Sequence, residues 1–499
     1  MVKLVIKGES RMVCHFQANK INETGDIYAR RYAILAAVML GSIMGPLDAS
    51  IVNIILPTIT QFFGTDIATA QWVPMVYLLT ISSLLLLYGR LGDILGYKKI
   101  YLCGIAGFTV ASALCTLSPT IYWLILFRAI QGLAAGMMMS MPFALITASF
   151  PPAERGKALG INAISVSAGL AIGPTLGGLI ASLSSWRYCF LINMPIGIIG
   201  FLYANYIIPQ LKGQPGKIDM SGAIIGFISL FFFLLSVNSF QNLGSYRISF
   251  IMLSIAVLAG ISFLVMESKN TDPLVDLDLF RNATFSFANA SALLNFMSQY
   301  VMVFLTPFYL QRLLLYAPNE VGMVMSAFPL AVMAVAPLSG FLSDRIGTRT
   351  LACLGAAICA LSLFLMSLLP ASVASSDVVW RLALFGLGTG IFQSPNNSAV
   401  MGCAPRSQLG IASGILATVR NIGMALGIAI GGAVLYAYVP FEVLQDAVIG
   451  GPDATAFLSG LKYAYISGGI LTGLAAVTSL IRGDEEGENP VQKNTRAAR

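Results

Sequence analysis

The sequence predicts an all-α polytopic membrane protein of two six-helix bundles, with two further helices inserted between them. Composition is the first reason: 57% of the residues are hydrophobic and 10% are charged, with a mean hydropathy of +0.80, whereas soluble domains carry about 25% charged residues. The second reason is a series of about fourteen apolar stretches, each near the roughly 20 residues with which a helix spans a bilayer. The third is an internal repeat.

Basic residues are distributed unevenly between the two sides of the predicted membrane. If the apolar stretches alternate in direction, 22 of the 29 Lys and Arg fall on the side that holds both termini. Positive charge collects in cytoplasmic loops, so we expect both termini in the cytoplasm and the chain in the cell membrane. The same bias explains the net charge of +7. Because the basic residues are scattered over loops, we expect no binding of nucleic acid.

Motifs for soluble chemistry are missing from the sequence. The seven Cys form no C-x-x-C pair and the single His lies in the polar N-terminal segment, so we expect no metal site. The sequence also contains no G-x-x-x-x-G-K-[ST] phosphate loop. We therefore expect no cofactor, no enzymatic activity and no direct use of ATP, which leaves an ion gradient as the energy source.

The repeat relates the first and last thirds of the chain. A glycine-rich segment that ends in an acid occurs at Gly89–Asp93 and again 251 residues later, at Gly340–Asp344. Glycines and prolines of the following helices recur at 253 or 254 residues, and parallel repeats of this kind place a substrate site near the membrane midplane. The predicted parts are a cytoplasmic tail (1–31), an N-terminal six-helix bundle (32–210), two inserted helices with cytoplasmic linkers (211–282), a C-terminal six-helix bundle (283–482) and a second cytoplasmic tail (483–499).

Several of these motifs carry a family resemblance. The Gly-Arg-Leu-Gly-Asp element, Arg128 and the stretch Gly169–Gly178 resemble the major facilitator superfamily. Three further stretches are similar to its fourteen-span drug:proton antiporter branch: Leu47–Pro57, Trp186–Gly197 and Gly388–Asn397. The resemblance implies the major facilitator fold with 14 spans. The loop motif departs from the family, because Ile94 and Tyr97 stand where the family usually has basic residues.

Two charged residues are predicted inside apolar helices. Arg128 lies in an uninterrupted apolar run, where a charge costs at least ~2.5 kcal/mol and normally faces a partner or a water-filled cavity. Asp48 lies about 24 Å into its helix at 1.5 Å per residue. A carboxyl group that is neutral when sealed and ionised when wetted can couple transport to protons, and the resemblance implies this role for both residues. Helix packing remains open for each, with Asn53 as a possible partner of Asp48.

The resemblance also implies a conformational latch between the two halves, for which a basic turn that sets topology is the alternative. The predicted latch residues are Gly89, Arg90, Gly92, Asp93, Gly96, Lys98, Asp344 and Arg345. A small-residue motif on the fifth helix would permit close helix packing, and by resemblance it favours export. Its residues are Gly169, Gly173, Pro174, Gly177 and Gly178.

The predicted substrate cavity is rich in amides. No Asp or Glu lies within the predicted spans of the C-terminal half, which disfavours dicationic substrates, and amides beside Met and aromatic residues suit a neutral or weakly anionic, ring-bearing molecule. Each amide could instead form a helix–helix hydrogen bond. The candidate cavity residues are Asn53, Gln131, Asn295, Gln299, Gln393, Asn396, Asn397, Arg420 and Asn421.

We therefore expect a proton-gradient-driven secondary transporter that moves small amphipathic organic molecules by alternating access. The favoured function is efflux of drugs or metabolites, and the alternative is uptake of a neutral nutrient or vitamin such as riboflavin. A sensor or scaffold is disfavoured because the tails are short. The expected partners are a small-molecule substrate, protons and the lipid bilayer. We expect a monomer, since one chain contains a complete pathway in this architecture.

Overall fold

The computed structural model describes residues 28–65, 67–70, 72–210, 213, 219–239, 246–270, 275–316, 318–439 and 452–482. These residues are almost entirely helical, and none of them is in a strand. The predicted tails, 1–31 and 483–499, lie outside this part of the chain apart from residues 28–31.

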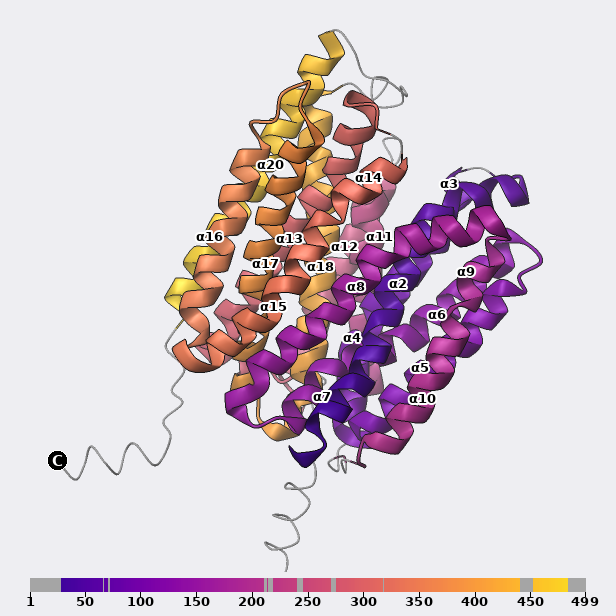
Figure 1. Ribbon diagram of the computed structural model, residues 1–499. Coiled ribbons are helices and arrows are strands. Elements are labelled where there is room, and N and C mark those ends of the chain that lie inside the picture. The colour runs from indigo at the N-terminus through magenta and orange to yellow at the C-terminus, as the bar shows by residue number, and fades with distance from the viewer. Residues whose placement is uncertain are drawn as a thin grey trace, which may run out of the picture.

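Eighteen α-helices are formed by the described residues, and Figure 1 labels most of them. The helices of the first half are α2 (Arg31–Phe63), α3 (Ile67–Ala70), α4 (Trp72–Leu95), α5 (Tyr97–Thr116), α6 (Ile121–Ser140), α7 (Pro142–Ser149), α8 (Arg155–Leu183), α9 (Arg187–Leu191) and α10 (Asn193–Ile207). They are followed by α11 (Met220–Ser239) and α12 (Tyr246–Glu267). The second half contains α13 (Ala283–Phe308), α14 (Pro318–Met325), α15 (Ala327–Ile346), α16 (Thr348–Met366), α17 (Ser375–Cys403), α18 (Leu409–Tyr438) and α20 (Pro452–Ile481).

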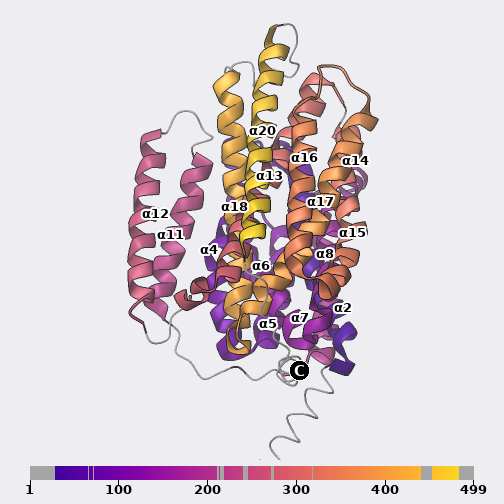
Figure 2. The same cartoon turned by 90° about the vertical axis from the view of Figure 1, so that its left-hand side faces the viewer.

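The helices form two bundles that stand side by side, α2 to α10 in one and α13 to α20 in the other (Figure 1). Equivalent pairs pack in both: α2 with α8 and α5 with α6 in the first, α13 with α18 and α16 with α17 in the second. The bundles meet where α4 packs on α18 and α8 packs on α15. Figure 2 shows α11 and α12 at one side of the molecule, where α11 contacts α4 and α18.

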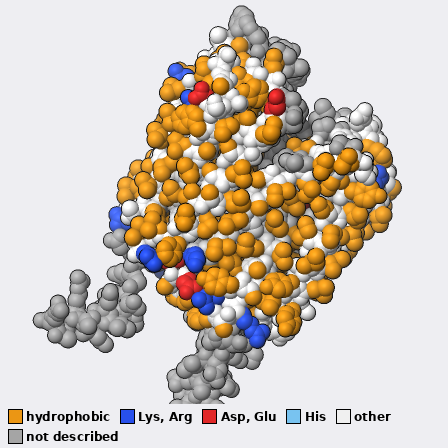
Figure 3. All heavy atoms as spheres, viewed as in Figure 1, with side chains coloured by type: hydrophobic (Ala, Val, Ile, Leu, Met, Phe, Trp, Pro, Cys, Tyr) orange, Lys and Arg blue, Asp and Glu red, His pale blue; other side chains and the backbone are white. Residues whose placement is uncertain are grey.

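Twelve helical segments of the described chain are long and apolar enough to cross a membrane. The all-helical membrane fold is therefore confirmed, while the count of fourteen stays a prediction. The other two expected positions hold α11, with a shorter apolar stretch over Ser221–Val237, and α17, whose 29 residues include one arginine and three amides. Figure 3 shows hydrophobic side chains over the middle of the molecule, with Lys and Arg towards its ends, as lipid contact requires.

Two predicted helices are each broken into two pieces. Pro142 follows Met141 and separates α6 from α7. Pro195 lies near the start of α10, just after the break at Ile192 that separates α9 from α10. Proline has no N–H and clashes with the preceding turn, so it interrupts the helical hydrogen bonds. The second break places Asn193 at the first position of α10.

The turns that follow α4 and α15 use the same backbone conformation. Gly96 has φ 95° and Gly347 has φ 93°, a left-handed region that glycine adopts without a Cβ clash. The two glycines are 251 residues apart in the sequence. The repeat therefore extends to the backbone of the predicted latch.

The carboxylate of Asp219 connects the start of α11 to the segment that follows α12 by hydrogen bonds. Its carboxylate accepts hydrogen bonds from the backbone N–H of Gly222 (3.0 Å), from Ser221 Oγ (2.6 Å) and from Asn270 Nδ2 (2.7 Å). These bonds, the one from Gly222 first, lower the pKa of Asp219 below its usual value. Because Asn270 follows α12, this cap holds the start of α11 against the end of α12.

Candidate functional site

The two predicted intramembrane charges form a buried ion pair. Asp48 on α2 is 1% exposed and Arg128 on α6 is 0% exposed, and Arg128 Nη1 donates to Asp48 Oδ2 at 2.5 Å. Arg128 Nε donates to the Val73 carbonyl at 3.2 Å, and the guanidinium carbon lies 4.0 Å from the centre of the Tyr77 ring. The carboxylate partner that Arg128 requires is therefore Asp48.

Gln131, predicted in the substrate cavity, belongs to this ion pair. It lies one helical turn after Arg128, so both side chains point from the same face of α6. Its Oε1 accepts from Arg128 Nη1 at 2.7 Å, and its Nε2 donates to Asp48 Oδ1 at 3.1 Å. The same nitrogen lies 2.8 Å from Ser112 Oγ on α5. Gln131 thus fixes the arginine relative to the carboxylate.

Asn193 completes the site, and the sequence reasoning did not select it. Its Nδ2 donates to Asp48 Oδ1 at 2.9 Å, and the side chain is fully buried. The signal was available, because Asn193 lies in the stretch Trp186–Gly197 that carries the family resemblance. Without the fold, nothing in that stretch shows that its asparagine meets α2.

The four side chains form a polar centre inside the first bundle, which we call the Asp48 network (Asp48, Arg128, Gln131 and Asn193). Each oxygen of the carboxylate accepts at least one N–H, and the ion pair has no net charge. Such a centre costs desolvation that its hydrogen bonds must offset. Three buried polar atoms around it have no partner in the described part of the chain: Arg128 Nη2, Tyr77 Oη and Asn193 Oδ1.

A second acid, Asp93 at the end of α4, joins the two bundles. Its Oδ1 accepts from the Gly410 backbone N–H at 2.8 Å and from Tyr97 Oη at 2.7 Å, and its Oδ2 accepts from the Ile411 N–H at 3.0 Å. These N–H groups lie at the start of α18, where the helix dipole favours a negative charge. Tyr97, a departure from the family pattern, therefore supports the predicted latch residue.

Asp344 at the end of α15 makes the equivalent contact with the first bundle. Its two carboxylate oxygens accept from the backbone N–H groups of Gly156 (2.9 Å) and Lys157 (3.0 Å), at the start of α8. Gly156 and Gly410 are 254 residues apart, so the repeat relates the two contacts. One acid from each bundle thus caps a helix of the other.

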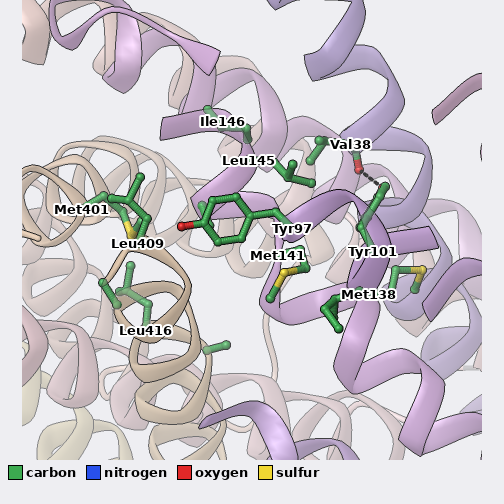
Figure 4. Close-up of a cluster of buried hydrophobic side chains, with 14 of the residues drawn as sticks. Val38, Tyr97, Tyr101, Met138, Met141, Leu145, Ile146, Met401, Leu409 and Leu416 are labelled. Atoms are coloured by element: carbon green, nitrogen blue, oxygen red, sulfur yellow. Dashed lines mark hydrogen bonds between the residues drawn. The ribbon is translucent and has the colours of Figure 1, made fainter. Parts of the chain in front are cut away.

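Close backbone packing and apolar side chains surround the contacts of Asp93 and Asp344. A Cβ atom on Gly89 or Gly340 would collide with the backbone carbonyl of the facing glycine in the other bundle. Ser394 Oγ donates to the Gly156 carbonyl at 2.7 Å. Figure 4 shows Tyr97 and Met141 of the first bundle facing side chains of α17 and α18. At this end the bundles are in direct contact.

The other predicted latch residues take different positions. Lys98 Nζ donates to the Asn205 carbonyl at 2.7 Å, within the first bundle. Arg345 is exposed and its guanidinium carbon lies 4.2 Å from the Phe341 ring centre. Arg90 interacts electrostatically with Asp93. Gly92 and Gly96, on either side of Asp93 in the sequence, are buried.

The glycines of α8 lie against α2. A Cβ on Gly169 would lie 2.9 Å from the Ile43 carbonyl, and Gly173 and Gly177 meet Ser50 and Ile51 of α2 at similarly short range. Gly178 faces open space, and nothing is described for the side chain of Pro174. Close packing of α8 on the helix that carries Asp48 accounts for the first three glycines.

The remaining candidate cavity residues have different surroundings. Asn396 Nδ2 donates to the Ala288 carbonyl at 3.0 Å and its Oδ1 accepts from the buried Arg482 at 3.3 Å, so it connects helices of the second bundle. Asn295 is fully buried beside Cys359, and Gln299 Oε1 is buried without a hydrogen-bond partner within the described ranges. Half-buried side chains are Gln393, Asn397, Arg420 and Asn421, and Asn53 is exposed. A shared substrate cavity stays a prediction for this set.

No metal centre is formed by the part of the chain that the structure describes, where no three His, Cys, Asp or Glu side chains come together.

A comparison with known protein families shows to which family the chain belongs. Residues 38–272 and 288–499 match the profile of the Major Facilitator Superfamily.

The chain belongs to the major facilitator superfamily.

Two curated relatives within this superfamily are informative. The chain is 33% identical to the riboflavin transporter RibZ of Clostridioides difficile (strain 630), over 80% of this chain and 87% of that protein. It is 34% identical to the multidrug resistance protein Stp of Mycobacterium tuberculosis (strain CDC 1551 / Oshkosh), over 81% and 76%. The crystal structure of the human organic anion transporter MFSD10 (TETRAN) has the same fold, with a TM-score of 0.65, 16% identity and coverage of 90% and 99%.

Membership of the superfamily confirms several predictions. The chain is a multi-pass membrane transporter of small molecules and not an enzyme.

Proposed function

We propose that this major facilitator protein is a proton-coupled antiporter of the fourteen-span branch, which exports small amphipathic organic molecules across the cell membrane. The observation that carries the proposal is the Asp48–Arg128 pair, almost fully buried inside the first bundle. Ionisable residues within membrane bundles are rare and mark proton relays or ion pathways.

Protonation of Asp48 changes the charge of a sealed site. With the carboxylate neutralised, Arg128 carries a positive charge that no acid of the Asp48 network balances. A buried charge without its partner is costly, so the protonated state favours a conformation in which the guanidinium meets water or another acceptor. Proton binding on Asp48 thereby supplies a free-energy difference between two conformations, which coupled transport requires.

The two latches support alternating access. They close the bundles at the end where Asp93 meets α18 and Asp344 meets α8. We propose that this end faces the cytoplasm, in line with the basic loops, so that the structure corresponds to an outward-facing carrier. Transport then requires both acids to leave the helix termini that they cap. One chain holds both latches, which fits a monomeric carrier.

Two features support fourteen spans. The helices α11 and α12 follow the first bundle in the sequence and precede the second. α12 is strongly apolar, and only 11% of its most apolar 18-residue stretch is buried inside the protein, which leaves the rest for lipid. The amides and Arg381 of α17 lower its hydropathy, but with 29 residues it is long enough to cross the bilayer.

Uptake of a neutral, ring-bearing nutrient is the second candidate function. The similarity to a riboflavin transporter favours it, as does the lack of acids in the predicted spans of the C-terminal half. The similarity to a multidrug resistance protein favours export. The direction of the coupled flux separates the two.

Transport by the purified protein in proteoliposomes tests the proposal, with a pH gradient of either sign and with riboflavin and ethidium as separate probes. An antiporter moves the probe against the direction of proton flow, and an importer moves it with the protons. Asp48→Asn should abolish gradient-driven flux while the protein still inserts. The matched control is Asp278→Asn, whose exposed pair with Arg281 should be dispensable. Unchanged gradient-driven flux in Asp48→Asn would remove Asp48 from the mechanism.

A further inference from the structure

Asn193 supports an inference about how Asp48 holds its proton, and this inference rests on the proposed function. Its Nδ2 donates to Asp48 Oδ1 at 2.9 Å. Its Oδ1 is buried and has no hydrogen-bond partner among the described residues. Buried polar atoms are nearly always paired, so an unpaired amide oxygen beside an ionisable carboxyl group requires an explanation.

The other amide of the network is fixed in one orientation. Gln131 Oε1 accepts from Arg128 Nη1, while its Nε2 faces Asp48 Oδ1. Turning this amide over would place its NH₂ group against the guanidinium, which only donates. Asn193 has no such second bond. Its amide can rotate and exchange Nδ2 for Oδ1 without breaking any other hydrogen bond.

The two orientations of Asn193 suit the two states of Asp48. An ionised carboxylate only accepts hydrogen bonds, and the observed Nδ2 contact serves it. A protonated carboxyl group has one O–H that must donate, and Asn193 Oδ1 would accept it after rotation. Arg128 and Gln131 present only N–H groups to Asp48, so neither can accept this proton in the observed arrangement.

We propose that Asn193 is a positioning residue that stabilises protonated Asp48, by rotating its amide from donor to acceptor. In the proton step, one O–H bond of a hydronium ion breaks, an O–H bond forms on Asp48 Oδ1, and a water molecule leaves. Arg128 keeps its charge and its hydrogen bond to Gln131. Asn193 thereby offers a hydrogen-bond partner to either protonation state of Asp48.

Other groups around Asp48 are less suited to accept the proton. The charged and titratable side chains that interact electrostatically with Asp48 are Arg128 from α6, Tyr77 from α4, Cys115 from α5 and Cys189 from α9. The Cys115 thiol lies 3.7 Å from Gln131 Oε1, and the Cys189 thiol lies 3.7 Å from the Gly177 carbonyl oxygen. Sulfur is also a weak acceptor. Tyr77 faces the guanidinium with its ring. The amide oxygen of Asn193 is the stronger acceptor in contact with the carboxyl group.

A comparison of two variants tests the proposal. The full-length protein in lipid nanodiscs is titrated with protons, and the infrared C=O band of its protonated carboxyl group, assigned by its loss in Asp48→Asn, gives the midpoint of proton binding. Asn193→Leu removes a donor to the carboxylate and also the acceptor of the protonated form, whereas Gln131→Leu removes only a donor to Asp48. We expect the midpoint of Asn193→Leu to lie about 0.5–1 pH unit below that of Gln131→Leu, a three- to tenfold weaker proton binding, since the protonated form loses one further hydrogen bond.

Gln131→Leu is the matched comparison, because it removes a group that only donates to Asp48. It destabilises the carboxylate, so its midpoint should move to higher pH. Asn193→Ala repeats the test with a smaller side chain if leucine prevents folding. A midpoint in the Asn193 variants that equals or exceeds the midpoint of Gln131→Leu, with the Asp48 band still present, overturns the inference and leaves the proposed function standing. A wild-type titration in which no band depends on Asp48 overturns the proposed function itself.

Discussion

The carboxylate of Asp48 accepts hydrogen bonds from Arg128, Gln131 and Asn193, and none of these side chains is reached by water. The ionised state of this buried carboxylate is therefore stabilised by the three side chains together. Removing one member of a buried ion pair is far more costly than removing both, because the remaining charge has no compensation.

Substitutions of Arg128 should reveal this dependence. Arg128→Ala leaves Asp48 buried without a cation, and for buried pairs that loss costs about 3–5 kcal/mol. Arg128→Lys keeps the charge but cannot bond to Asp48 and the Val73 carbonyl with one planar group, so its loss should be smaller. Thermal unfolding in detergent measures stability, and proteoliposome flux should decrease in the same order.

The double variant Asp48→Asn/Arg128→Ala is the control for this prediction. It removes both charges, so it should be more stable than Arg128→Ala alone. Simple addition of the two single losses would show that the charges do not interact.

Among the helices, α8 and α18 have the same role in opposite bundles, since the start of each is capped by an acid from the other half. Asp93 is nearly fully buried, whereas Asp344 is half-buried. A charge at a helix N-terminus contributes about 0.3–2 kcal/mol, with the larger values in partly buried sites. The Asp93 latch should therefore be the stronger of the two.

Asp93→Asn should open the latched end. The amide loses the charge and presents NH₂ to donors at the start of α18, which favours separation of α4 from α18. Spin labels at the exposed positions Leu95 and Gly402 report the distance between the bundles at this end. We expect a larger fraction of long distances, with a smaller effect for Asp344→Asn. Identical distance distributions in wild type and Asp93→Asn would show that the latch does not hold this conformation.

At the scale of the whole molecule, the two bundles are joined at one end and α11 and α12 stand outside them (Figure 2). If both inserted helices span the membrane, their connection lies on the side opposite to the termini. Arg247 lies at the beginning of α12, and Lys269 follows its end. These positions therefore lie on opposite sides in a protein of fourteen spans.

Single cysteines at these positions test the topology, in a background without the native cysteines. Arg247→Cys should react with a membrane-impermeant maleimide added to intact cells. Lys269→Cys should react only after the membrane is permeabilised, as should a cysteine in the C-terminal tail. Labelling of both positions from the same side would contradict the crossing of α12.

The sequence alone determined the membrane class, the positions of the apolar helices, the repeat and the placement of Asp48 and Arg128 within apolar helices. These features depend on composition and spacing along a single helix, which are read directly from the chain. The interruptions at Pro142 and Ile192 are also local, but the sequence reasoning treated each of the two segments as one helix.

Only the tertiary structure decided which residues meet. Asp48 and Asn193 are 145 positions apart, and Asp93 and Gly410 are 317 apart. Such contacts depend on the rotation and tilt of whole helices, which many packed side chains set together. For this reason the sequence did not show that Gln131 and Asn193 bond to Asp48, or that Tyr97 bonds to Asp93.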